Sequence, residues 1–292
     1  MVTKKIFSRE STWGYIFVLP LLIGFSVFMV YPLVSSLILS FTDSNGINLP
    51  NFVGLKNYVE LLKDDRFKQS LFHTLIYVVG TVPVGVFLSL LLANVLNNKI
   101  KGKTFFRTAF MIPYITSMVA IATVWKWLFN TEYGVINNVL EFLNLYQPPW
   151  LTKEGWAMFS LIIVGIWKGL GYNMILYLAG LQNISESIYE AAEIDGANAI
   201  QKFFRIKIPL LRNTTIFVTI MSTIGSFQVF DLVYVMTNGG PANSTSVIVY
   251  YIYQNSFIFF KQGYASAAAY ILFIIILIIT AIQFGLNNRG KD

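Results

Sequence analysis

The sequence predicts an all-α polytopic membrane protein with six transmembrane helices. Of its 292 residues, 55% are hydrophobic and only 12% are charged, whereas soluble domains have about 25% charged residues. Six stretches with at most one charged side chain each are long enough to cross a bilayer, which takes about 20 residues. A chain of this composition belongs in a membrane.

The six spans are expected at 13–42, 70–98, 108–129, 156–181, 213–236 and 265–286. The first is too long for a signal peptide and lacks a small-residue cleavage site, so we expect an uncleaved helix. Because proline interrupts helical hydrogen bonding, this helix should bend or end near Pro20 and Pro32. The aromatic run 247–260 is short for a span, so we expect a helix packed at the outer surface.

The distribution of cations predicts that both termini are cytoplasmic. When loops are assigned alternately to the two sides, 13 of the 21 Lys and Arg residues fall on one side and 6 on the other. The remaining two, Lys126 and Lys168, lie within spans. The richer side is cytoplasmic by the positive-inside bias, which places residues 185–212 in the cytosol. The formal charge of +7 is therefore mostly a sign of topology and not of a nucleic-acid surface.

Several enzyme classes are not supported by the sequence. There is no cysteine, and His73 is the only histidine, so an interfacial role is favoured over metal binding. Gly102-Lys103-Thr104 looks like the end of a phosphate-binding loop, but Asn97 stands where its first glycine should be, and no strand precedes it. No Gly-x-Ser-x-Gly elbow is present. If ATP drives this protein, the nucleotide binds to another chain.

Residues 185–212, called loop 185–212 below, form a charged segment between two apolar spans, with acids first and bases after. Gly196 favours a bend between two short helices. Asn198 and Gln201 can cap the second helix, and Pro209 can end it. Apolar residues recur at helical spacing, at Ala197, Ile200, Phe204 and Ile208. A loop of this length cannot bury the apolar face by itself. The face therefore needs a protein partner, or, as the alternative, it lies on the lipid headgroups.

The spacing of this loop resembles the cytoplasmic EAA signature of permease subunits in binding-protein-dependent ABC importers. The resemblance is carried by Glu190, Ala191, Ala192, Gly196, Ile206, Ile208 and Pro209, with Ile208 where the family usually has Leu. A wider resemblance to maltose-type sugar permeases covers roughly Phe52 to Leu286. It is most specific in the EAA loop, in the segment 167–182 and in the Gly239-Gly240-Pro241 turn.

The resemblance implies a type I ABC importer fold. It implies one permease domain over 1–292, with a core at about 70–287, the first helix 13–42 added and a coupling loop at 185–212. The subunit would be no enzyme and hold no cofactor, because ATP and Mg would be bound by partner ATPase subunits. The implied partners are a second homologous permease, two ATP-binding subunits, an extracytoplasmic solute-binding protein and membrane lipid, and no nucleic acid is expected. The location would be the bacterial cytoplasmic (inner) membrane.

The implied cargo is a carbohydrate, and an oligosaccharide is favoured. Neighbouring families share the EAA loop, so a permease for another polar solute such as a glycerol phosphodiester stays open as an alternative. An ion-coupled secondary transporter is a further alternative. It needs an acid within the membrane, and Asp231 is the one candidate, near the end of its span.

Two groups of functional positions follow from the resemblance. The ATPase-coupling positions are Glu190, Ala191, Ala192, Asp195, Gly196, Ala197, Phe204, Ile208 and Pro209. The substrate-pathway positions are Tyr114, Met118, Lys168, Gly169, Tyr172, Ser226 and Val229. Three of these, Met118, Lys168 and Val229, differ from the residue types of a maltose-type site.

The ionisable side chains within spans need an explanation, because a charge in the bilayer centre costs about 2.5–3.5 kcal/mol on insertion scales. Lys168, about twelve residues into its span, could face a sugar or could pair with a carbonyl or carboxylate of a partner subunit. Asp231 and Lys126 lie toward the ends of their spans and could pair with each other.

Overall fold

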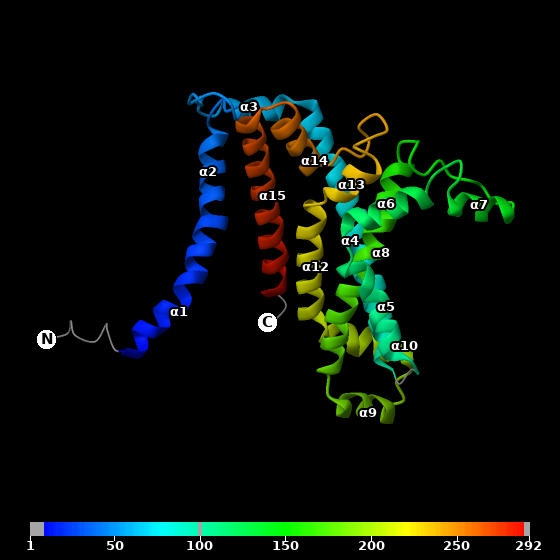
Figure 1. Ribbon diagram of the computed structural model, residues 1–292. Helices are drawn as coiled ribbons and strands as arrows, with labels where there is room; N and C mark the ends of the chain where they lie inside the picture. Colours follow the sequence, from blue (N-terminus) through cyan, green and yellow to red (C-terminus); the bar gives the residue numbers. More distant parts are fainter. Residues whose placement is uncertain (1–8, 99–100, 289–292) are drawn as a thin grey trace. The chain divides into compact units, whose positions relative to one another are not determined.

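The computed structural model describes residues 9–98 and 101–288, and these residues are helical apart from connecting loops and one isolated bridge between Thr42 and Phe52 (Figure 1). By length and composition, four helices could cross a membrane: Trp13–Ser40, Asp65–Asn97, Trp156–Gln182 and Gln262–Gly285. A fifth span is reached when the bent pair α5 (Lys103–Ile115) and α6 (Met118–Leu128) is counted as one. The all-α prediction is confirmed, and the predicted sixth span does not meet these criteria.

Part of the topology prediction lies outside the described residues. The cations concerned are Lys4, Lys5, Lys99, Arg289 and Lys291.

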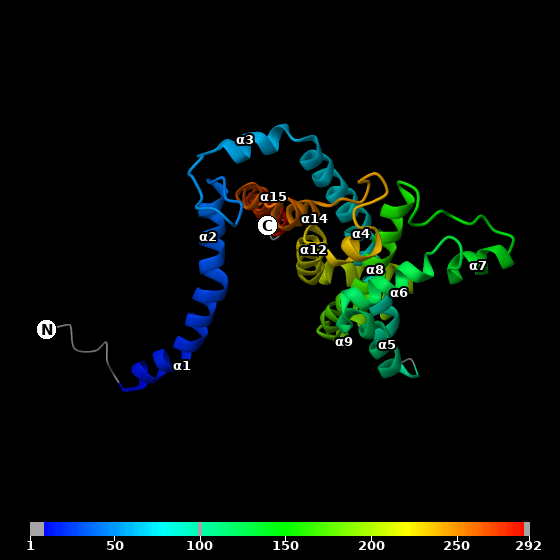
Figure 2. The same cartoon turned by 45° about the horizontal axis from the view of Figure 1, so that its top comes forward.

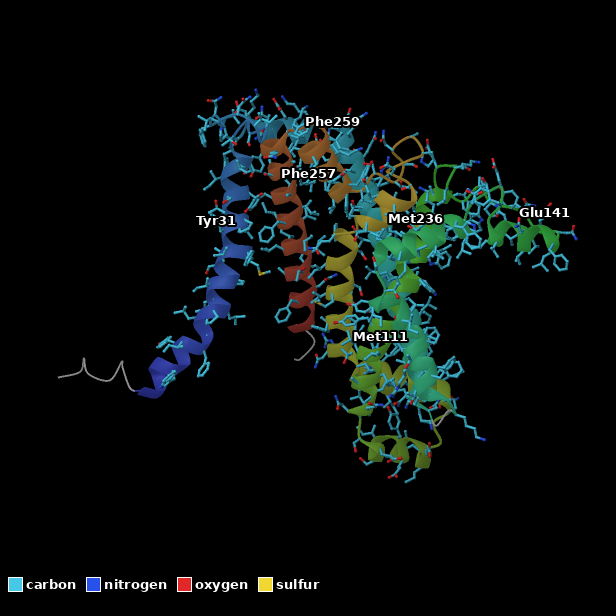
Figure 3. The ribbon with its side chains drawn as sticks, viewed as in Figure 1. Tyr31, Met111, Glu141, Met236, Phe257 and Phe259 are labelled. Carbon is cyan, nitrogen blue, oxygen red and sulfur yellow. The ribbon has the colours of Figure 1, made fainter. Side chains whose placement is uncertain are left out.

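The chain divides into two compact units, of which the first runs to Asp64 and includes Ile252–Ile271. Its first span consists of α1 (Arg9–Phe25), the π-helical turn η1 (Ser26–Val30) and α2 (Tyr31–Ser40). The apolar side chains of this span are exposed, as expected for a helix that meets lipid or another subunit; Tyr31 in Figure 3 is 70% exposed.

The first span continues through both prolines, so the prediction that it ends there is wrong. The reason is the turn before Pro32. A proline in an α-helix lacks its N–H, and its ring clashes with the carbonyl four residues earlier. Here the Tyr31 N–H donates to the Ser26 carbonyl five residues back, and this wider turn accommodates the ring of Pro32.

The rest of the first unit is held by polar contacts beside α3 (Lys56–Lys63). The Asn57 amide donates to the carbonyls of Ser40 and Thr42, both at 2.8 Å. The Gly263 N–H, near the start of α15 (Gln262–Asn288), donates to the Ser44 carbonyl at 3.0 Å. These contacts fix the loop between α2 and α3.

The second unit contains Asp65–Tyr251 and the end of the chain from Leu272. Its centre is the pair α4 (Asp65–Asn97) and α8 (Trp156–Gln182), and α5, α12 (Arg212–Phe227) and α13 (Asp231–Met236) also pack on α8 (Figure 2). Helix α5 approaches α8 closely at Gly171, where any Cβ atom would overlap the Phe110 carbonyl. A glycine is therefore required for this packing.

Two predicted spans are interrupted. Helices α5 and α6 meet at an angle of 98°, because Thr116 and Ser117 are extended, with ψ of 145° and 132°. The predicted fifth span is divided into α12 and α13 by the non-helical residues 228–230. Length and hydropathy predicted continuous helices at both places, and neither quantity detects α13 turning to pack on α6.

The remaining helices of this unit are short. Helix α7 (Val135–Phe142) is fixed by the Trp150 indole N–H, which donates to the Asn137 side-chain oxygen at 2.8 Å. The predicted helix in 247–260 is present as α14 (Ile248–Tyr253), which belongs to this unit up to Tyr251, and is followed by the π-helical turn η3 (Gln254–Ile258) of the first unit. Helix α14 packs near the start of α4, where its Ile248 N–H donates to the Thr74 hydroxyl at 2.9 Å.

Candidate functional site

Loop 185–212 contains two short helices that meet at Gly196, as predicted. Helix α9 (Glu186–Ile194) leads to Gly196, whose φ of 74° is in the left-handed region that favours glycine. Helix α10 (Ala199–Lys202) then begins with the predicted capping box. The Gln201 N–H donates to the Asn198 side chain and the Asn198 N–H donates to the Gln201 side chain, both at 2.9 Å.

A π-helical turn, η2 (Phe203–Lys207), follows α10 and changes the predicted apolar face. The Ile208 N–H donates to the Phe203 carbonyl five residues back, so the helix passes Pro209 and ends at Leu210 in α11 (Ile208–Leu210). Pro209 therefore does not end it as predicted. The extra residue in the turn also rotates Ile208 away from Phe204, and Ile208 instead packs against the core that includes Phe203 and Leu211.

The exposed apolar surface of the loop keeps two residues of the predicted face, Ile200 and Phe204, and adds Ile194. Ile194 is 87% exposed, Ile200 is 70% exposed and Phe204 is 57% exposed. Sequence reasoning missed Ile194, although it lies two residues before the predicted bend at Gly196. Large apolar side chains at such exposure on a charged loop are suited to another protein or to lipid headgroups, the two alternatives that the sequence leaves open.

The remaining predicted coupling positions differ in accessibility. Glu190, Ala191, Asp195, Gly196 and Pro209 are exposed, Ala197 is half-buried and Ala192 is buried. Between the two helices, the Lys202 ammonium donates to Glu193 at 2.8 Å. This hydrogen bond, together with the attraction of the Lys202 charge, lowers the pKa of Glu193.

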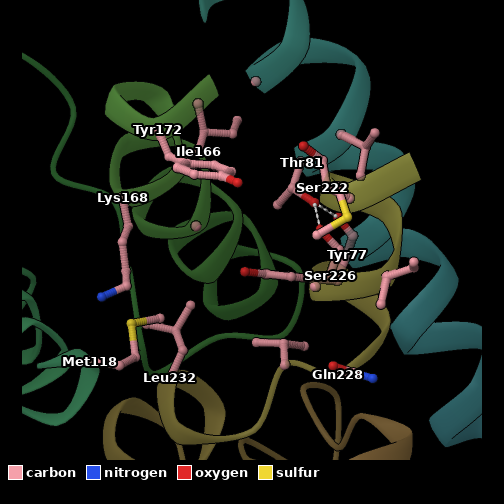
Figure 4. A pocket seen from close by; sticks show the side chains of 18 of the residues that line it. Tyr77, Thr81, Met118, Ile166, Lys168, Tyr172, Ser222, Ser226, Gln228 and Leu232 are labelled. Atoms are coloured by element: carbon pink, nitrogen blue, oxygen red, sulfur yellow. Dashed lines mark hydrogen bonds between the residues drawn. The ribbon is translucent and has the colours of Figure 1, made fainter. Parts of the chain in front are cut away.

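A cavity of about 490 Å³ lies among α4, α5, α6, α8, α12 and α13 (Figure 4). All seven predicted pathway positions line it: Tyr114, Met118, Lys168, Gly169, Tyr172, Ser226 and Val229. They come from three predicted spans, and the two helix breaks bring Met118 and Val229 to the same cavity. Their role toward a substrate stays a prediction.

Two tyrosines form one wall of the cavity. The rings of Tyr114 on α5 and Tyr172 on α8 are stacked, with centroids 4.6 Å apart and planes 11° apart. Tyr114 follows Pro113 near the end of α5, so the break between α5 and α6 lies directly beside this pair. Stacked phenols offer ring faces and hydroxyl groups, which suit the apolar faces and hydroxyls of a sugar.

Lys168 is tied to the break between α5 and α6. Its ammonium donates to the Thr116 carbonyl at 2.8 Å and reaches the Pro113 carbonyl at 3.5 Å. Figure 4 shows it pointing away from Thr81, Ser222 and Ser226. Carbonyls at the end of an interrupted helix lack helical partners, and a cation near them is favourable. Of the alternatives for Lys168, one is pairing with a carbonyl of a partner subunit. The structure supplies such a carbonyl, that of Thr116, from the chain itself.

Sequence reasoning missed the contribution of α4 to the cavity. Tyr77, Thr81 and Gly85 line it, and the Thr81 hydroxyl lies 3.2 Å from the Ser226 hydroxyl. These positions are four residues apart, so a polar and small-residue stripe within an apolar span was the available signal. Deeper in the wall, the Asn173 amide donates to the Ser222 hydroxyl at 3.0 Å.

The predicted pairing of Lys126 with Asp231 is wrong. The Lys126 ammonium donates instead to the Val235 carbonyl at 3.1 Å, and in the described part of the chain no ion pair joins the two residues. The reason is that α13 begins at Asp231 and turns to pack on α6. Asp231 lines the cavity instead. No group of three or more potential metal ligands occurs among the residues that the structure describes.

Comparisons with known proteins agree on one family. Residues 65–291 match the family described as "binding-protein-dependent transport system inner membrane component". The lactose transport system permease protein LacF of Rhizobium radiobacter is 42% identical over 284 residues, covering 95% of each chain. The trehalose/maltose transport system permease protein MalF of Thermococcus litoralis is 33% identical over 292 residues, covering 100% of this chain and 99% of the relative.

A solved structure has the same fold. A chain of a bacterial alginate ABC transporter, in complex with an alginate pentasaccharide-bound periplasmic protein, superposes with a TM-score of 0.87 at 23% identity. The match covers 100% of this chain and 98% of that one. The residues matched by the family and the two relatives together show that this chain belongs to the family of binding-protein-dependent transport system inner membrane components.

Proposed function

We propose that this chain is the transmembrane permease subunit of an ATP-driven importer that translocates a carbohydrate delivered by an extracytoplasmic solute-binding protein. A second homologous permease and two ATP-binding subunits complete the complex, and ATP and Mg bind to the ATPases. The observation that carries the proposal is the exposed apolar surface of Ile194, Ile200 and Phe204 on a loop that directly continues α8, the helix that also lines the cavity.

In this proposal the chain has six spans in a bacterial cytoplasmic membrane, with both termini in the cytosol. Helix α12 supplies the remaining span: its 16 residues extend about 24 Å at 1.5 Å per residue, and the adjoining residues 228–230 add further length. Loop 185–212 then faces the cytosol, in agreement with its basic residues and the positive-inside bias.

The cavity favours an uncharged sugar. Its charged lining residues are Lys168 and Asp231, and the Lys168 ammonium is engaged by the Thr116 carbonyl. Tyrosines, Asn173, Gln228 and serines supply the remaining polar groups. An anionic phosphodiester would meet the Asp231 carboxylate without a free cation, so this alternative is less favourable. Names of relatives that transport lactose and trehalose/maltose support the same choice.

The test begins with the full chain, tagged and purified in detergent from its native host. The expected result is co-purification of ATP-hydrolysing subunits and a second permease. After reconstitution, sugar-loaded binding proteins should stimulate ATP hydrolysis and sugar uptake. A purified chain that takes up sugar alone, without ATPases, would contradict the proposal.

A substitution in the loop tests the docking role directly. Glu190→Lys should abolish sugar-stimulated ATP hydrolysis while membrane insertion remains normal, because it reverses an exposed charge beside the apolar surface. Glu186→Lys is the matched control, since it makes the same charge change one turn earlier on α9. Normal stimulation in the Glu190→Lys complex would refute the assignment of loop 185–212 to ATPase docking.

One observation favours an ion-coupled transporter as a second candidate. Asp231 lines the cavity, and an acid in a transport pathway can carry a proton. Uptake that survives ATP depletion and collapses with the proton gradient would favour this candidate over the importer.

A further inference from the structure

One cation of loop 185–212 reaches a transmembrane helix. The Lys207 ammonium, at the end of η2, donates to the Asn94 side-chain oxygen on α4 at 2.6 Å. It also lies 5.5 Å from the centre of the Tyr189 ring on α9. A cation above a ring face is attracted to the ring, and an ammonium bound to an amide oxygen makes a charge-assisted hydrogen bond. A single side chain therefore contacts both α9 and α4.

Burial makes this contact stronger than a surface ion pair. Lys207 and Asn94 are both half-buried. The pKa of Lys207 is lowered, first by burial and second by the nearby charge of Lys202. Apolar contacts surround the contact, because Phe203 of the loop packs with Leu90 and Ala93 of α4. The loop and the end of α4 thus form one packed body.

Helix α4 extends from this contact to the cavity. Gly85, nine residues before Asn94, lines the cavity, which is about 14 Å away at 1.5 Å per residue. The proline inside α4, Pro83, lies beyond Gly85, so the helix between the two positions has no proline. A displacement at Asn94 is therefore transmitted along a continuous helix to the cavity wall.

Lys202 provides a contrast within the same loop. Its ammonium pairs with Glu193 at 2.8 Å, so it joins α10 to α9. Lys202 thus links two helices of the loop, whereas Lys207 links the loop to α4, the helix whose Gly85 lines the cavity.

We propose that Lys207 is a positioning residue that ties loop 185–212 to α4 through Asn94, so that displacement of the loop by a docked ATPase moves the α4 wall of the cavity. This inference rests on the proposed function. It assigns the coupling between loop and cavity to Lys207, which lies between Ile206 and Ile208 at a position that the EAA pattern does not specify.

The test uses the absence of cysteine from the chain. Gly85→Cys introduces one thiol, and a Cβ at Gly85 has no atom within 4 Å, so the cavity accommodates it. The full complex with its ATPases is treated with a water-soluble maleimide, once without nucleotide and once trapped with ATP, Mg and vanadate. Mass spectrometry of this chain gives the two labelling rates, and their ratio reports movement of the α4 wall.

The expected result is a ratio at least threefold away from 1 in the complex that carries only Gly85→Cys. Adding Lys207→Met, which keeps a long side chain but removes the cation, should bring the ratio close to 1 while the amount of co-purified ATPase stays unchanged. Adding Lys202→Met should leave the ratio as it was. Asn94→Ala should act like Lys207→Met, and combining the two should cause no further change if they act through one contact.

Each other outcome overturns the inference in a distinct way. A Lys207→Met complex with an unchanged ratio, or a ratio of 1 with Lys207 present, removes the coupling role and leaves the proposed function standing. If Lys207→Met loses its ATPase, Asn94→Ala decides, because Asn94 belongs to α4 and not to loop 185–212. Loss of ATPase in both variants shows a role in assembly instead. Absence of any ATPase from the unsubstituted complex refutes the proposed function, and the inference with it.

Discussion

Loop 185–212 and the cavity are joined by the same helix, α8, but their structures depend on different kinds of contact. In the loop, the capping box joins residues 3 apart and the Lys202–Glu193 contact joins residues 9 apart. In the cavity, Lys168 and Thr116 are 52 residues apart, and Thr81 and Ser226 are 145 apart. The two short helices α9 and α10 are specified by nearby residues, whereas the cavity, like the contact of Lys207 with Asn94, exists only when several helices have packed.

The largest expected effect is on the cavity side. Gly171→Ala would place a Cβ atom against the Phe110 carbonyl, and a backbone atom cannot move aside as a flexible side chain can. Overpacking of this kind should destabilise the chain by about 3 kcal/mol, measured as the free energy of unfolding in detergent. Gly169→Ala is the control, because its Cβ would have no atom within 4 Å. Equal stability of the two variants would show that α5 does not approach α8 as described.

The next effect should come from Lys168. Lys168→Met removes a hydrogen bond from a charged donor to the Thr116 carbonyl, and the expected loss is about 2 kcal/mol of stability. The loss should appear without any sugar, since the partner is the chain's own backbone. A variant of unchanged stability but impaired sugar uptake would instead assign Lys168 to substrate binding.

A smaller and local effect is expected in the loop. Asn198→Ala removes the capping box at the start of α10, which should cost about 1 kcal/mol. Amide hydrogen exchange should accelerate in Ala199–Lys202 while α8 keeps its protection. Asn213→Ala, an exposed amide at the start of α12, serves as control. Faster exchange throughout the cavity helices would contradict the local character of the loop.

The smallest effect should come from Glu193→Gln, because an exposed ion pair adds little to stability. The pKa of Glu193 is lowered in the folded chain, so any stabilisation is present above the ordinary value of 4.5 and disappears as the pH falls through the lower folded pKa. Melting curves of the variant and the parent should differ only above that window, and only slightly. A change larger than that of Asn198→Ala would reverse the order expected here.

The same contrast explains how much could be predicted from the sequence. Two helices meeting at Gly196 and the Asn198–Gln201 capping box follow from residues within one or two turns, and both predictions are confirmed. The removal of Ile208 from the predicted apolar face could not be predicted from nearby residues. It requires the π-helical turn Phe203–Lys207, which depends on Pro209 and on the core against which Ile208 packs.

For the cavity, the resemblance named the seven positions that the fold brings together. The resemblance could not predict which residues these seven positions contact. The tie from Lys168 to Thr116 requires the break after α5, and apolar length alone predicts a continuous span there. Asp231 lines the cavity and does not form the expected ion pair with Lys126, because α13 packs on α6. This tertiary contact could not be predicted from apolar length either.

The π-helical turns before Pro32 and Pro209 alter the angular position of the side chains that follow them. One additional residue shifts every later position by about 100° around the axis, because an α-helix has 3.6 residues per turn. Deleting one residue from 203–207 would remove the extra residue of this turn and rotate every later side chain of the helix back by about 100°. The two prolines thus set which side of a helix meets its neighbours, and a single-codon deletion could change that without shortening a span appreciably.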